Sequence, residues 1–173
     1  MTATVTHARP TFGLLTAALV FLADQLSKWL VAGPLGLTEL GQNIHVLPFF
    51  DLTRVHNYGI SLGLLTAGSD SGRWLLVGMT ALIAAVVAWW LTREEQRGDQ
   101  LALGLVLGGA LGNIVDRARL GYVFDFLDLH IGEFRPFLVF NVADACISIG
   151  VVILILRAFL VREPKPSKEP DNA

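Results

Sequence analysis

The chain has 173 residues, of which 53% are hydrophobic and only 16% are charged, with a mean hydropathy of +0.57. Soluble domains carry about 25% charged residues, so this composition excludes an ordinary soluble domain and indicates an integral membrane protein. The net charge of −2 offers no basic field for nucleic acid, and the single cysteine, Cys146, excludes an intramolecular disulfide.

Four apolar segments approach the roughly 20 residues that a helix needs to cross the hydrocarbon core. We predict membrane-spanning helices at about residues 12–32, 74–92, 100–116 and 140–160. Residues 1–162 are expected to form one integral membrane domain. The Pro-rich, charged segment 163–173 is typical of a disordered tail.

The N-terminal apolar segment has two interpretations. Arg9 followed by an apolar run resembles a secretory signal peptide. However, the run ends in the polar sequence DQLSKW, and Phe21 occupies the place where a cleavage site needs a small residue. We therefore interpret the segment as an uncleaved membrane anchor.

The distribution of Lys and Arg predicts the orientation, because cytoplasmic loops are enriched in these residues. The three short segments that flank or join the helices at one end carry Arg9, Arg93, Arg97, Arg157, Arg162, Lys165 and Lys168. The longer segments, about 33–73 and 117–139, carry five cations over many more residues: Arg54, Arg73, Arg117, Arg119 and Arg135. We expect both termini in the cytoplasm and the long segments outside.

On this topology, the polar residues of three spans lie at one level, near the outer surface. An ionisable side chain that faces lipid costs about 2.5–3.5 kcal/mol, so such residues usually face protein or a wet cavity. Asp144, at the start of an otherwise apolar helix, is therefore a candidate functional residue. The residues at this level are Asp24, Gln25, Lys28, Asn113, Asp116, Arg117, Asn141 and Asp144.

Several of these residues also have structural explanations. Asp24 and Lys28 are spaced i, i+4 and are expected mainly to neutralise each other. Asp116 is expected to cap the third helix, whereas for Arg117 a structural and a site role remain equally open. Gly104, Gly108 and Gly112 form a small-xxx-small repeat, which lets helices approach closely in lipid, so the third helix is expected to be central.

The long outer segments predict a small amount of extended structure. Residues 44–65 are rich in β-branched and aromatic residues and favour short strands, arranged as a small sheet on the membrane surface. GYVFDFLDLHIGEF, from residue 121 to 134, favours a strand or a short interfacial helix. Asp128 and His130 could ligate a metal, but no third ligand has evident spacing, and we predict neither metal nor cofactor.

The sequence lacks the HExxH and P-loop motifs, and Ser27, Ser61 and Ser148 have no neighbouring histidine base in sequence. Its carboxylates are therefore the remaining candidates for chemistry. Two carboxylates held close together share a proton and can act as acid and base on a carbonyl. A small transporter or proton-relay subunit, and a structural protein whose acids only join helices, are the alternatives. Transporters usually have internal repeats and polar sites near the midplane, and the sequence shows neither. The carboxylates assigned to the outer level are Asp116, Asp125, Asp128 and Asp144.

Five motifs follow one another along the chain: DQLSKW (24–29), HNYGISLG (56–63), GGALGNIVDR (108–117), GYVFDF (121–126) and FNVADACISIG (140–150). As an ordered set they resemble the lipoprotein signal peptidase family, also called signal peptidase II. The resemblance implies four transmembrane helices with an extracytoplasmic β-cradle and a short outer interfacial helix. It also implies an intramembrane aspartic endopeptidase of the bacterial inner membrane.

This resemblance also implies roles for individual residues. The catalytic pair falls on Asp125 and Asp144. The resemblance implies that four polar residues support this pair or contact the substrate and the antibiotic globomycin: Asn57, Asn113, Arg117 and Asn141. It implies structural roles for Asp24, Lys28 and Asp116. The chain departs from the family pattern at Ile60, Ser61 and Ala145, and the first two put the shape of the substrate groove in question.

The expected substrate is a prolipoprotein whose cysteine already carries diacylglyceryl, cut just before that cysteine. Membrane lipid is the expected surrounding partner, nucleic acid is not expected, and the enzyme is expected to be a monomer. The active site is expected near the extracytoplasmic face.

Overall fold

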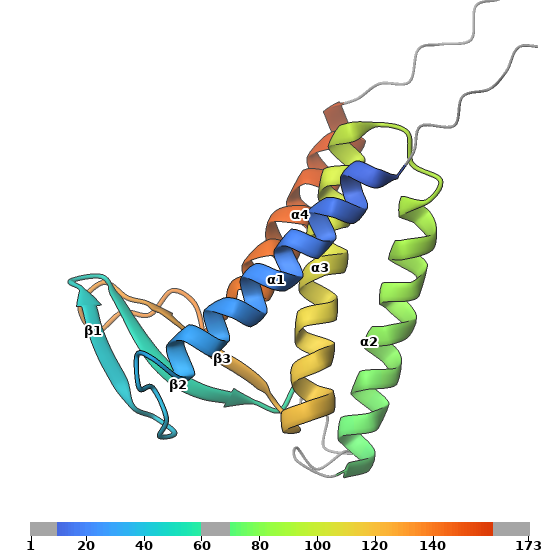
Figure 1. The fold of residues 1–173 in the computed structure, drawn as a ribbon. Helices are drawn as coiled ribbons and strands as arrows, with labels where there is room; N and C mark the ends of the chain where they lie inside the picture. The colour runs from blue at the N-terminus through green and yellow to red at the C-terminus, as the bar shows by residue number, and fades with distance from the viewer. Residues whose placement is uncertain (1–9, 60–69, 161–173) are drawn as a thin grey trace, which may run out of the picture.

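The computed structural model describes residues 10–59 and 70–160 (Figure 1). Its elements in chain order are α1 (Thr11–Ala32), β1 (Asn43–Leu47), β2 (Phe50–Asn57), α2 (Asp70–Leu91), α3 (Arg97–Leu120), β3 (Val123–Leu129) and α4 (Val142–Leu160). All four helices are long and apolar enough to cross a membrane. The prediction of a mainly helical membrane protein with a small sheet is therefore confirmed.

Some elements differ from their predicted bounds. α3 begins at Arg97 and continues to Leu120, beyond the apolar segment at both ends. The segment after α3 forms the strand β3 rather than an interfacial helix, and residues 10–59 and 70–160 contain no fifth helix. Ile60, Ser61 and the predicted tail 163–173 lie outside the described residues.

α3 is the central helix, as predicted. Half of its spanning window is buried, against 11% for α2 and for α4. Its glycines allow α1 and α4 to pack closely against it. A Cβ on Gly108 would collide with the carbonyl oxygen of Ala17 in α1, and a Cβ on Gly109 would collide with the carbonyl oxygen of Ala143 in α4. The apolar core between the helices consists of Ala17, Ala84, Leu91, Leu103 and Leu107.

The end of α3 is held by two features. Gly121 adopts a left-handed conformation with φ of 87°, which stops the helix without the steric penalty that a side chain would bring. Arg73 of α2 donates hydrogen bonds to the last-turn carbonyl oxygens of Arg117, over 2.8 Å, and of Ala118. A guanidinium at this position satisfies carbonyl groups that have no partner within the helix.

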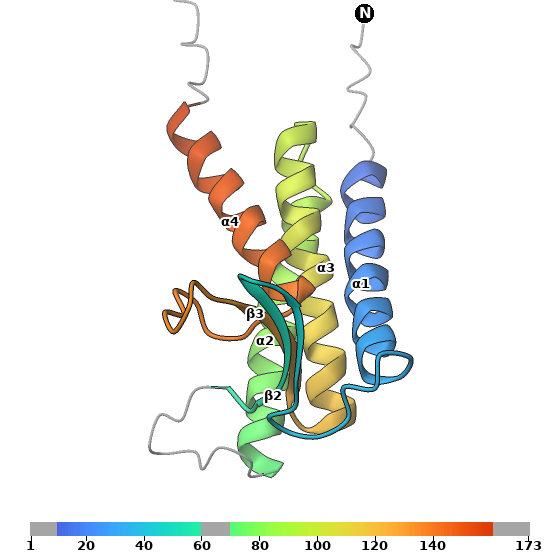
Figure 2. The same cartoon turned by 90° about the vertical axis from the view of Figure 1, so that its left-hand side faces the viewer.

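The three strands form one antiparallel sheet in the order β1-β2-β3. In the register of β2 and β3, Val55 lies opposite Asp125 and Asp51 lies opposite Asp128. The sheet projects to one side of the bundle, near the end opposite the first turn of α1 and the last turn of α4 (Figures 1 and 2). Its own apolar core consists of Val31, Leu37, Leu52, Phe124 and Phe126.

Candidate active site

Asp125 and Asp144 belong to different elements, β3 and α4, and one backbone pairing brings these elements together. The residue before Asn141, Phe140, forms an isolated bridge with Leu127 of β3. Phe140 donates its N–H to the Leu127 carbonyl over 3.1 Å, and its carbonyl accepts the N–H of Leu127 over 2.8 Å. The chain therefore enters α4 directly beside the strand that carries Asp125.

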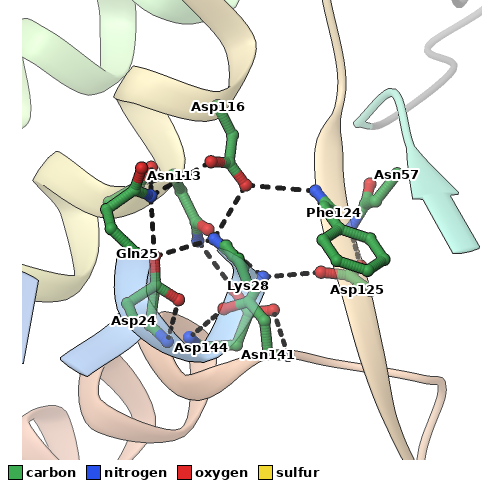
Figure 3. A network of polar contacts seen from close by, with 12 residues as sticks. Asp24, Gln25, Lys28, Asn57, Asn113, Asp116, Phe124, Asp125, Asn141 and Asp144 are labelled. Carbon is green, nitrogen blue, oxygen red and sulfur yellow. Dashed lines mark hydrogen bonds and ion pairs between the residues drawn. The ribbon is translucent and has the colours of Figure 1, made fainter. Parts of the chain in front are cut away.

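Asn141 contacts both carboxylates (Figure 3). Its side-chain amide donates to Asp125 Oδ1 over 2.6 Å. At the first turn of α4, its backbone N–H donates to Asp144 Oδ2 over 3.3 Å, and its side-chain oxygen accepts the backbone N–H of Asp144 over 2.9 Å. This reciprocal arrangement caps the helix and fixes the direction of the Asp144 side chain.

Two further asparagines complete the hydrogen bonding of the pair. Asn113 of α3 donates to Asp144 Oδ1 over 2.8 Å and accepts a hydrogen bond from the Asn141 amide over 3.2 Å. Asn57, at the end of β2, donates to Asp125 Oδ2 over 3.0 Å. Four elements therefore supply the cluster: β2, α3, β3 and α4.

The environment of Asp125 changes its acidity. Its side chain is almost fully buried, and burial, followed by the negative charge of Asp144, raises the pKa of Asp125 to about 6. Hydrogen bonds from Asn57 and Asn141 and the charge of Lys28 oppose this increase. A carboxyl group with a pKa near neutrality can both accept and return a proton.

A buried ionic cluster lies behind the pair. Lys28 Nζ lies 2.8 Å from Asp24 Oδ2 and 2.7 Å from Asp116 Oδ2. Asp24 also accepts the backbone N–H of Ala143, at the start of α4, over 3.0 Å. Asp116 accepts the N–H of Phe124, the residue before Asp125, over 3.1 Å. These contacts attach α1 and α3 to the two segments that carry the carboxylates.

Gln25, for which the sequence predicted no role, is part of this ionic cluster. Its amide donates to Asp24 Oδ2 and to Asp116 Oδ1, each over 3.1 Å. The sequence did carry one indication of this role, because Gln25 is a polar residue next to Asp24 in an otherwise apolar helix. Its partner on α3 could not be identified from spacing, because the two residues are 91 positions apart.

Arg117 lies in the last turn of α3, where its charge interacts with Asp144, Asp125 and Asp116. Its Nε is buried and has no hydrogen-bond partner among the described residues. A buried donor of this kind costs free energy unless a partner binds it. Arg117 is therefore suited to donate a hydrogen bond to a bound substrate.

Asp128 and His130, the possible metal ligands of the sequence, belong to a polar cluster beside the sheet. Asp128 accepts hydrogen bonds from Thr53, over 2.9 Å, and from Arg135, over 3.2 Å. His130 Nε2 lies 3.3 Å from Asp51, whose other carboxylate oxygen pairs with His45. Asn43 and these neighbours lower the pKa of Asp51. This polar cluster joins β1, β2 and the segment after β3.

Each carboxylate of the pair lines its own cleft. The Asp125 cleft, of about 470 Å³, is bounded by Val55, Asn57 and Tyr58. The Asp144 cleft, of about 330 Å³, is bounded by the α4 residues Ala145, Ser148 and Ile149 and by Phe137. The buried Asp125 and the half-buried Asp144 are therefore each reached from a separate cleft.

These observations define a class: a four-helix membrane protein with two carboxylates joined by one asparagine where a small sheet meets the helix ends. Residues 16–160 match the family model of signal peptidase (SPase) II. The chain therefore belongs to the signal peptidase II family, as its motifs predicted.

Similar proteins support this membership. The lipoprotein signal peptidase of Rhizorhabdus wittichii is 63% identical over 161 residues, which cover 93% of each chain. That of Sphingopyxis alaskensis is 58% identical over 152 residues, or 88% of this chain and 87% of the relative. A bacterial membrane enzyme solved at 2.3 Å resolution superposes with a TM-score of 0.74 at 30% identity, covering 92% of this chain and 94% of its own.

Proposed function

We propose that this protein is an aspartic endopeptidase that removes the signal peptide from diacylglyceryl-modified bacterial prolipoproteins, just before the lipidated cysteine. One observation carries the proposal: Asn141 contacts Asp125 and Asp144 at once. The raised pKa of Asp125, about 6, agrees with it. Family membership supplies the substrate class, since related chains are named lipoprotein signal peptidases.

The proposed reaction uses the two carboxyl groups with one shared proton. The ionised member accepts a proton from a water molecule, whose oxygen bonds to the scissile carbonyl carbon. The protonated member donates a hydrogen bond to the carbonyl oxygen. The tetrahedral intermediate then collapses, the C–N bond breaks and the leaving amine receives the proton that the first carboxylate took from water, which leaves the pair singly protonated again. Because the two titrations are coupled, the pair as a whole carries the shared proton.

The surrounding residues have supporting roles in this proposal. Asn57, Asn113 and Asn141 orient the two carboxylates, because each donates a hydrogen bond to at least one of them. Arg117 binds the substrate backbone through its Nε, which has no partner within the described residues. The charges of the ionic cluster behind the pair hold the helices in register and take no direct part in the chemistry; they are Asp24, Lys28 and Asp116.

The same proposal includes an orientation. The enzyme spans the bacterial inner membrane as a monomer, with both termini in the cytoplasm and the sheet and carboxylate pair at the extracytoplasmic face. The acyl chains of the substrate remain in the bilayer, where each buried CH₂ contributes about 0.8 kcal/mol to the membrane anchoring of the substrate. Globomycin is expected to inhibit by occupying the same site.

The decisive experiment is cleavage of a diacylglyceryl-modified prolipoprotein by the purified protein in lipid. Wild type should release the signal peptide, whereas Asp125→Asn and Asp144→Asn should not. Asp128→Asn is the matched control, because Asp128 lies on the same strand but contacts Thr53 and Arg135 instead of the pair. An intact substrate with wild type, or cleavage by both variants of the pair, would overturn the proposal.

A further inference from the structure

Leu138 lies between the two clefts of the site. Among the described residues that bound these clefts, it is the single residue that lines both the Asp125 cleft and the Asp144 cleft. Its exposed fraction is 91%, the highest among the large apolar side chains of the described residues. An exposed apolar side chain at the mouth of a polar site is suited to contact a bound ligand.

The Asp144 cleft has the character of a membrane-facing surface. Ala145, Ser148 and Ile149 are spaced i, i+3 and i+4, so they lie on one face of the spanning helix α4. Phe137 and Leu129 add apolar surface from the segment before α4 and from the end of β3. This cleft is suited to an apolar side chain that arrives from the bilayer.

The Asp125 cleft has a different character. It is bounded by β2 and the residues after it, with His56, Asn57 and Tyr58 offering polar atoms. These residues belong to the sheet and the segment that follows it, and they lie outside the spanning helices. This cleft is suited to a polypeptide that continues away from the membrane.

We infer that Leu138 separates two substrate subsites: the Asp144 cleft binds the last apolar side chain of the signal peptide, and the Asp125 cleft binds the chain that follows the lipidated cysteine. This inference rests on the proposed peptidase function. A signal peptide is apolar and embedded in the bilayer on one side of the scissile bond, and the mature chain is polar and outside on the other. The two clefts have the same polarity difference, each is lined by one carboxylate of the pair, and they share Leu138. Leu138 is thus a positioning residue that sets the register of the scissile bond.

The test uses wild-type enzyme with two series of diacylglyceryl prolipoproteins, one varied in side-chain size just before the scissile bond and one just after the cysteine. Ser148→Leu narrows the Asp144 cleft at an exposed position, so kcat/KM should fall roughly 10-fold for large residues before the bond. The kcat/KM values of Ser148→Leu for the substrates varied after the cysteine should equal those of wild type. Val139→Phe, which narrows the Asp125 cleft, should produce the reverse pattern.

Leu138→Ala should reduce the difference in kcat/KM between small and large side chains in both substrate series, because the boundary between the clefts is lost. Ile131→Ala is the matched control: Ile131 is 73% exposed in the same segment and bounds neither cleft. The inference is overturned if Ser148→Leu alters both series equally, or if Leu138→Ala behaves like Ile131→Ala. Failure of wild type to cleave any substrate would instead overturn the proposed function.

Discussion

The side-chain amide of Asn141 donates a hydrogen bond to Asp125 Oδ1 over 2.6 Å, and this contact stabilises the ionised form of a buried carboxyl group. Burial and the charge of Asp144 act in the opposite direction and raise the pKa of Asp125 to about 6. The acidity of the pair therefore depends on a balance that single substitutions can shift.

Asn141→Ala should raise the pKa of Asp125 further, because it removes a donor that favours the carboxylate. The alkaline limb of the kcat/KM profile, where the pair loses its shared proton, should then move to higher pH, together with a lower maximum. Asn57→Ala should move this limb in the same direction, since Asn57 also donates to Asp125. An alkaline limb that stays in place in both variants would contradict this account. The measurement is cleavage rate against pH with a lipidated substrate.

Asp125→Asn should change how stability depends on pH. The pKa of Asp125 is about 6 in the folded protein, against 3.8 for an unperturbed aspartate, so the folded state binds more protons between these values. The corresponding stabilisation is present below about pH 4 and is lost as pH rises through 6. The free energy of unfolding of wild type, relative to that of Asp125→Asn, should therefore increase by up to about 3 kcal/mol as pH falls from 7 to 4.

Thermal unfolding in detergent across this pH range measures that difference. Asp70→Asn serves as the reference, because it makes the same substitution at a side chain that is 93% exposed. A constant difference between wild type and Asp125→Asn at all pH values would show that Asp125 titrates normally.

Lys28→Met should destabilise the protein strongly. Lys28 is buried between Asp24 and Asp116, so its removal leaves two carboxylates facing each other without a cation. Breaking a buried ion pair in this way costs about 3–5 kcal/mol. Arg157→Met, which breaks the more exposed pair with Asp99, should cost less. Chemical or thermal unfolding of the two variants tests the order, and an equal loss would contradict it.

Gly112→Ala should reduce both stability and cleavage. An added Cβ at this position would lie 2.5 Å from Asp24 Oδ2, so α3 or the carboxylate must move. Overpacking of this kind costs about 1–3 kcal/mol. Gly78→Ala on α2 is the control, because its Cβ would meet no atom within 4 Å and alanine favours the helix. If both variants unfold at the same temperature, the close approach at Gly112 is not required.

The helices were predictable because hydrophobicity over about 20 residues identifies a span directly. The first turn of α3 was missed because it is polar: Gln100 donates to the Glu94 carbonyl, and Asp99 pairs with Arg157 of α4. Tertiary partners satisfy these groups, so a hydropathy pattern cannot reveal them. The sequence of residues 121–134 was compatible with a strand or a short helix. Pairing with β2 makes residues 123–129 a strand.

For the candidate site, too, some features could be predicted from the sequence and others depended on the tertiary structure. The residue types, their motifs and their common level along the helices could be read from the sequence, because each depends on local spacing or on the cost of polar groups in lipid. The contacts among them depended on the tertiary structure: Ala143 and Asp24 are 119 residues apart, Gln25 and Asp116 are 91 apart, and Leu138 adjoins both clefts. Composition and periodicity determined that this chain crosses a membrane four times. Only the folded chain decided which carboxylates share an asparagine, because that depends on how β3 pairs with the residue that precedes Asn141.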